Sequence, residues 1–153
     1  MIQNTGSNRI TIMETRSGHI YVDIERSILN LNIKNDKYNN EEFENLCMVF
    51  QKFIEEAYNN KKKYYLLWHT KNIGMYPLTC YTKIKDMLES LKPKLEVVIH
   101  ATCLIVEPDF GSHILKFFFN IYKPLRPASV IHDIEESYSF FAKPECQNMV
   151  QFS

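Results

Sequence analysis

The sequence of 153 residues predicts an α/β fold: a mostly parallel sheet with an antiparallel hairpin at its N-terminal margin and about four helices. Three patterns predict this fold class. Two short segments near the N-terminus alternate between apolar and polar residues, a later segment has helical periodicity, and a continuous apolar run of strand length follows it. Strands that alternate with helices along a chain are typical of right-handed crossovers and a parallel sheet.

The N-terminal hairpin is predicted from two alternating segments. Residues 9–14 and 20–25 place apolar side chains at every second position, and Ser17 and Gly18 between them are turn formers. Residues 28–33 have a similar pattern, which allows a third short strand.

The clearest helical pattern lies at residues 41–58, and Asn39 with Glu42 resembles a capping box at its start. Residues 64–70 then form a continuous apolar run, as expected of a strand that is covered on both faces. The apolar stripe of the helix consists of Phe43, Leu46, Cys47, Phe50, Phe53, Ile54 and Ala57.

A second helix is expected to begin at Pro77 and to run to about Leu91. Proline is favoured in the first turn of a helix and disfavoured in its interior, so Lys92 and Pro93 are expected to end it. A strand region is expected at 95–106.

The last third of the chain is expected to continue the alternation. Asp109 can cap a third helix at 110–122, and a short strand follows at 129–132. Asp133 and Glu136 form a capping box that opens a fourth, short helix.

The domain organisation is simple because no repeat or linker interrupts the chain. We expect a loose N-terminus at 1–8, a single domain at 9–142 and a C-terminal tail at 143–153. The length is ordinary for one domain with a hydrophobic core.

The charge balance excludes a broadly electrostatic mode of binding. Eighteen Lys and Arg residues balance eighteen Asp and Glu residues. A neutral chain has no long-range attraction for nucleic acid or an anionic membrane, so we expect no nucleic-acid partner. No apolar run is long enough for a transmembrane segment.

Four cysteines are too few for a disulfide scaffold and none is spaced as Cys-x-x-Cys, so a reducing, intracellular and cytoplasmic location is expected. The bias toward Lys, Asn, Ile and Tyr is typical of an AT-rich genome. A viral protein, in the virion or the host cytoplasm, is therefore an alternative.

The last third carries a resemblance to a known fold group. A strand ending near Val106 is followed by a Phe-rich helix, a stop at Lys123 and Pro124, another strand, and the sequence DIEESYSFF at 133–141. This arrangement resembles SpoIIAA-like proteins, the fold group of STAS domains and of the CRAL-TRIO lipid-binding domains. The resemblance is one of architecture and spacing.

The resemblance implies a regulatory binding module or a lipid-binding domain. STAS regulators often present a phosphorylatable Ser at the start of the helix after the middle strand. The Asp-Ser pair is absent here, and Thr79 is the nearest hydroxyl, so Thr79 is a candidate phosphosite. The alternative is that Thr79 is an ordinary polar residue of a first turn.

Catalytic and cofactor motifs are absent from the sequence. There is no Gly-x-Ser-x-Gly elbow, dinucleotide-binding loop or Walker loop, so we expect no catalytic residues and no cofactor. The alternative, an enzyme, would need a pocket near His69, Gly74 and Asp109 with polar groups converging there. His100 and Cys103 are expected on opposite faces of one strand, which would prevent them from sharing a metal ion. A metal cluster of His69, Cys80 and Asp109 is conceivable, but no metal site is expected.

The predicted helix at 110–122 is apolar around its whole circumference. One stripe can face the sheet, and the second set of Leu115, Phe119 and Tyr122 then needs another cover. We therefore expect a non-catalytic regulatory or scaffold module whose partner-binding residues are Leu115, Phe119 and Tyr122, the partner being a protein or a second copy. A C-terminal tail that covers this helix, a small hydrophobic ligand or lipid carrier, and a viral structural or host-interaction protein are the alternatives.

Overall fold

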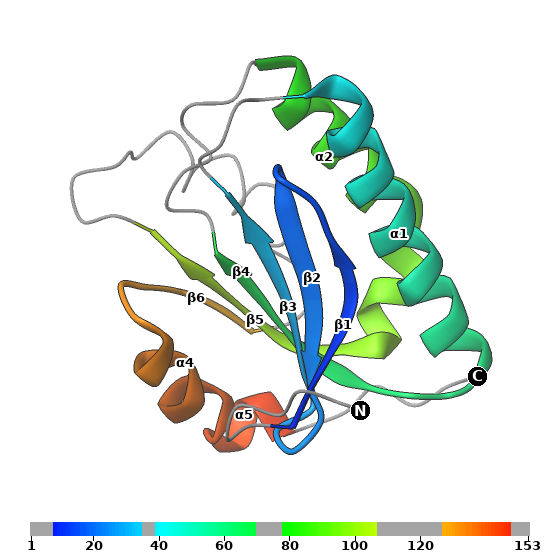
Figure 1. Cartoon of the computed structure of the whole chain (residues 1–153). Helices are drawn as coiled ribbons and strands as arrows, with labels where there is room; N and C mark the ends of the chain where they lie inside the picture. Colours follow the sequence, from blue (N-terminus) through cyan, green and yellow to red (C-terminus); the bar gives the residue numbers. More distant parts are fainter. Residues whose placement is uncertain (1–7, 35–38, 70–77, 107–126, 148–153) are drawn as a thin grey trace.

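The computed structural model describes residues 8–34, 39–69, 78–106 and 127–147. Within these residues the chain forms one six-stranded sheet in which every strand neighbours the next one along the sequence (Figure 1). Four helices are described, two on each face of the sheet. The α/β class predicted from the sequence is therefore confirmed.

The sheet is mixed. Its N-terminal part is an antiparallel meander, because β1 pairs with β2 and β2 pairs with β3 in antiparallel fashion. The remaining neighbours pair in parallel. The strands are β1 (Arg9–Glu14), β2 (Gly18–Asp23), β3 (Ile28–Ile33), β4 (Tyr64–His69), β5 (Ile99–Ile105) and β6 (Ala128–Ile131).

The helices form two layers around the sheet. Figure 1 shows α1 (Asn40–Asn59) and α2 (Leu78–Val98) running side by side over one face. The short helices α4 (Ile134–Phe141) and α5 (Pro144–Gln147) pack against the other face. We call these the α1 face and the α4 face of the sheet.

The helix predicted at 41–58 is confirmed as α1, with its cap and its apolar stripe. The Asn39 side chain caps it by accepting a hydrogen bond from the Glu42 backbone N–H at 2.9 Å. The predicted stripe faces the core, with Phe50 and Ile54 fully buried and Cys47 and Phe53 partly buried. Asp133 caps α4 in the same way, since its side chain accepts a hydrogen bond from the Glu136 N–H at 3.1 Å.

The hairpin between β1 and β2 depends on a close approach of backbone and helix. A Cβ atom on Gly18 would lie 2.6 Å from Cδ1 of Leu46 in α1. A side chain at this position would therefore displace the Leu46 methyl groups and approach the Asn32 carbonyl oxygen to 3.0 Å. The Thr15 hydroxyl accepts hydrogen bonds from the Ser17 and Gly18 backbone N–H groups and so fixes the turn.

The expectation that Lys92 and Pro93 end the second helix is wrong. Pro93 lies inside α2, which continues to Val98. Leu91, Leu95 and Val98 are all buried against the core, and burial of a side chain of this kind contributes about 1.5–3 kcal/mol. Tertiary packing thus outweighs the hydrogen bond that proline cannot donate.

The expectation for His100 and Cys103 is also wrong. The pairing of β4 with β5 slips between Tyr64 and Leu66, where β5 has one residue more than β4. This bulge turns His100 toward the α4 face, where its ring lies 4.8 Å from that of Tyr65, and Cys103 belongs to the core on the same face.

The chain remains packed beyond the expected domain boundary at residue 142. Cys146 of α5 is fully buried, and the Gln147 side chain donates hydrogen bonds to the Tyr65 hydroxyl at 2.8 Å and to the Phe141 carbonyl at 2.6 Å. Of the expected tail at 143–153, residues 148–153 lie outside the described part. So do the predicted helix at 110–122 and residues 1–7.

Truncation of Phe50 should destabilise the protein strongly. Its fully buried ring packs 5.6 Å from that of Trp68, and removing such a ring costs about 3–5 kcal/mol. Urea unfolding of Phe50→Ala should show this loss. Met48→Ala on the same helix is the control: Met48 is 63% exposed, so its loss should stay within about 0.5 kcal/mol. Equal losses in the two variants would contradict the assigned α1 face.

Candidate functional site

The outer edge of the sheet at β1 carries an unusual amount of exposed apolar surface. Among the described residues, four large apolar side chains are exposed, and three of them lie at this edge. Ile10 and Ile12 in β1 are 46% and 39% exposed, and Ile24 just after β2 is 49% exposed. Apolar side chains gathered in this way are a common feature of interaction sites.

The apolar side chains of β1 are exposed because α1 covers β2 but does not extend over β1. Ile10 pairs with Val22, whose side chain belongs to the core on the α1 face, so Ile10 points toward the same face. Helix α1 packs over β2, the neighbour of β1. The result is a groove of about 470 Å³ between the edge strand and α1. Its lining includes Ile10, Ile12, Val22, Ile24, Phe53 and Tyr64, with Ser27, Lys62 and Lys63 beside them.

The two ends of β1 carry opposite charges. At one end the Arg9 guanidinium lies over the Tyr21 ring, 4.6 Å from its centroid. At the other end Glu14 accepts a hydrogen bond from Lys34 Nζ at 2.9 Å, which holds the pKa of the Glu14 carboxyl below its usual range. We call β1 together with Ile24 and the groove the edge surface.

The α4 face carries a second hollow, of about 510 Å³. It lies where β3, β4 and β5 end, which is where parallel sheets usually bind ligands. The Tyr21 side chain that lines it is buried, and this burial raises its pKa. Among described residues the lining consists of Arg9, Tyr21, Asn32, Ile33, His69, Ile105, Asp133 and Ile134.

His69 in this hollow is held in a fixed orientation by Asn30. The Asn30 amide donates to the Ile28 carbonyl at 3.2 Å, so its oxygen faces His69 Nε2 at 3.0 Å and accepts from it. The neutral ring of His69 then carries its proton on Nε2 and its lone pair on Nδ1. No Ser, Thr or Cys is among the described lining residues, so this side of the hollow offers no aliphatic hydroxyl or thiol beside His69.

The structure does not bring together His69 and Cys80 of the metal cluster that the sequence left open. Cys80 is buried in the core on the α1 face, whereas His69 lines the hollow on the α4 face, so the sheet separates them. Asp109 lies outside the described residues. No group of three or more potential metal ligands occurs within the described segments.

The four cysteines form no disulfide, and all four are at least partly buried. Burial raises the pKa of Cys47 and of Cys103 to about 12 each. Cys80 and Cys146 are fully buried. A thiol is a nucleophile or a metal ligand only as thiolate, so Cys47 and Cys103 are poorly suited to either role.

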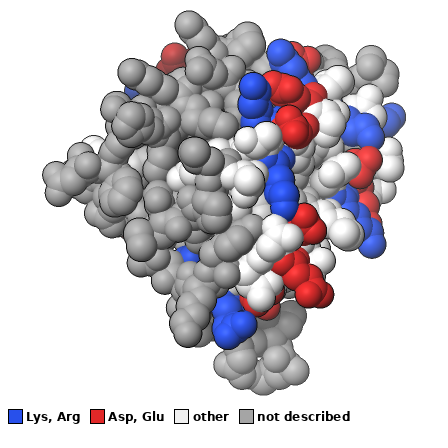
Figure 2. All heavy atoms as spheres, turned by 90° about the horizontal axis from the view of Figure 1, so that it is seen from above, with Lys and Arg blue, Asp and Glu red and all other residues white. Residues whose placement is uncertain are grey.

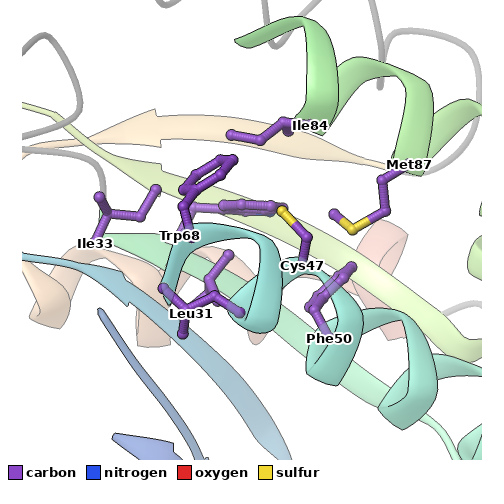
Figure 3. Close-up of a pocket in the computed structure, with 9 residues that line it drawn as sticks. Leu31, Ile33, Cys47, Phe50, Trp68, Ile84 and Met87 are labelled. Carbon is purple, nitrogen blue, oxygen red and sulfur yellow. The ribbon is translucent and has the colours of Figure 1, made fainter. Parts of the chain in front are cut away.

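An apolar cavity lies between α1, α2 and the sheet, lined by residues such as Leu31, Cys47 and Trp68 (Figure 3). Its volume of about 20 Å³ is that of a single water molecule. Drug-sized ligands need about 300 Å³ or more, so this part of the core does not hold a lipid.

Charged side chains are mixed in sign over the described part of the surface seen in Figure 2. Some pair between α1 and α2, as Lys83 does with Glu44 at 2.6 Å and Lys94 with Glu55 at 3.4 Å. No basic patch is visible on the described part of this face. No described helix is both long and apolar enough to cross a membrane.

Of the site residues expected from the sequence, the structure describes only Thr79. Leu115, Phe119 and Tyr122 lie outside the described residues. Thr79 is exposed in the first turn of α2 as described. The edge surface was not expected: the sequence predicted a hairpin at the margin of the sheet, which is confirmed, but not that Ile10, Ile12 and Ile24 would stay exposed there beside a groove.

Comparison of the chain with protein-family models, curated proteins and solved structures gives no significant match.

The native protein should react slowly with thiol reagents. With thiol pKa values near 12 for Cys47 and Cys103, almost no thiolate exists at pH 8. A colorimetric thiol reagent should therefore modify all four cysteines rapidly only after denaturation. Rapid modification of any of the four in the folded protein would contradict this assignment.

Protonation of His19 should destabilise the fold. Burial lowers the pKa of His19, helped by Lys34 and Arg9 and opposed by Glu14. Because the folded-state pKa lies below the unfolded value of about 6.5, stability should fall as the pH drops below that value and level off below the folded-state pKa. Urea unfolding between pH 5 and 7 should show a weaker decline in His19→Gln. An unchanged slope would rule out this role.

Proposed function

We propose that this chain is a non-catalytic protein-interaction module, regulatory or scaffold in role, that binds through the edge surface. The observation that carries the proposal is the concentration of exposed Ile10, Ile12 and Ile24 beside an apolar groove. An edge strand with unpaired backbone groups can accept a strand from another chain, and the groove can accept its apolar side chains.

The chemistry of the described residues supports binding over catalysis. The thiols of Cys47 and Cys103 are held protonated, and the hollow at His69 has no Ser, Thr or Cys among its described lining. The helix predicted at 110–122, with Leu115, Phe119 and Tyr122, is proposed as a second binding element. A SpoIIAA-like or STAS-like architecture is proposed with it, and the α/β class agrees with that at the level of fold class.

A small polar ligand is the second candidate, favoured by the hollow on the α4 face. The hollow lies at the carboxyl ends of the parallel strands and gathers Arg9, Asn32, His69 and Asp133. These groups could bind a small molecule through hydrogen bonds and charge. A shift of the His69 ring resonances on ligand addition, absent in His69→Phe, would support this function.

Polar substitution of the edge surface should abolish association. The triple variant Ile10→Ser, Ile12→Ser and Ile24→Ser removes three exposed apolar side chains without touching the buried core. We expect it to lose the complexes, with itself or with a partner identified by cross-linking and mass spectrometry, that the unmodified chain forms.

Met48→Ser is the matched control because Met48 is also exposed and apolar but lies on α1. It should retain those complexes, and circular dichroism should be unchanged in both variants. If the triple variant associates as the unmodified chain does, the edge surface is not the binding site.

A further inference from the structure

We infer that the partner at the edge surface is a second copy of this chain, joined by antiparallel pairing of the two β1 strands with Arg9 of one copy opposite Glu14 of the other. This inference rests on the proposed function and names its partner. The hydrogen-bonding direction, the charge order and the bulge of β1 support it.

The backbone of β1 offers hydrogen-bonding groups to another strand. The Ile24 N–H donates to the Asn8 carbonyl at 2.8 Å, so Asn8 and Ile24 face each other as a hydrogen-bonded pair. Such pairs alternate along an antiparallel ladder, so Ile10 also directs its backbone groups toward β2, while Arg9 and Thr11 direct theirs outward. No described strand pairs with this outer side.

The sequence of β1, RITIME, is complementary to its own reverse. When two copies run antiparallel with Arg9 opposite Glu14, Ile10 lies opposite Met13 and Thr11 opposite Ile12. Opposite charges then meet at both ends of the paired strands, and between them Ile10 of each copy meets Met13 of the other. Opposite-charge and apolar cross-strand pairs each stabilise a sheet.

The bulge of β1 makes this register geometrically feasible. In a regular strand, residues 9 and 14 would point to opposite faces, because the side-chain period is two. The pairing of β1 with β2 slips between Thr11 and Met13, so Arg9 and Glu14 sit opposite Asp23 and His19, which share a face. Arg9 and Glu14 therefore point to the same face, as residues opposite each other in a sheet must.

The apolar pair is consistent with the same register. Ile10 points toward the α1 face beside Val22, and Met13 packs against the core on that face. In the paired strands Ile10 of each copy would lie beside Met13 of the other, at the mouth of the groove. This arrangement covers apolar surface that is exposed in the single chain.

Charge reversal tests the inference. Sedimentation velocity over a dilution series should show a dimer for the unmodified chain. Arg9→Glu places two carboxylates opposite each other and Glu14→Arg places two guanidinium groups there, twice in a symmetric dimer. Each single variant should therefore raise the dissociation constant by about tenfold or more.

The variant R9E/E14R is the decisive one. It restores opposite charges between the copies but does not restore the contacts of Arg9 with Tyr21 or of Glu14 with Lys34 within the chain. Its dissociation constant should return to within about threefold of the unmodified value, since the cross-strand pair is then equivalent. Recovery would therefore report the contact between copies alone.

Three outcomes would overturn the inference: a monomeric unmodified chain at all concentrations, single variants that dimerise normally, or a double variant that does not recover. The proposed function has a separate test. If R9E/E14R fails to recover while the triple serine variant still loses an identified partner, the edge surface binds another protein. If the triple variant loses nothing, both ideas fail.

Discussion

Burial of the central strand on both faces is the constraint on which the rest of the structure depends. Leu66 and Trp68 face the α1 face and Leu67 faces the α4 face, and all three side chains are 0% exposed. A strand of this composition is stable only when both faces of its sheet are covered. The parallel connections bring α1 and α2 to one face, and α4 with α5 contributes to covering the other (Figure 1).

Coverage that is centred on β4 leaves the margins of the sheet less protected. The two edge strands of the described sheet, β1 and β6, differ in this respect. Strand β6 has four residues and no exposed side chain, and a short edge is one of the usual protections against unwanted pairing. Strand β1 has six residues, most of them exposed. An exposed apolar edge strand tends to pair with other chains, and proteins usually protect such an edge. The unprotected edge at β1 therefore indicates a binding role.

The sequence predicted those parts of the fold that local patterns specify. Helix α1 could be predicted from its apolar stripe and its cap, and strand β4 from its apolar run, because periodicity and capping act within a few residues. Pro93 and the β5 bulge were missed because they depend on packing: Leu95 and Val98 anchor the helix after the proline, and the slip in pairing turns His100. The edge surface was missed for a similar reason. The marginal position of the hairpin was predicted, but the exposure of Ile10 and Ile12 depends on how far α1 extends across the sheet, which the alternation at 9–14 does not specify.

The bulge in β1 also affects which strands can pair with this edge. A bulge normally protects an edge, because a regular strand cannot follow it in register without turning part of its side chains to the wrong face. A strand that carries a bulge at the corresponding place meets no such penalty, since the two irregularities oppose each other at Thr11 and Ile12. A second copy of β1 satisfies this condition by identity, and it also places Arg9 against Glu14 at both ends. The feature that excludes most strands from this edge is therefore the feature that admits its own copy.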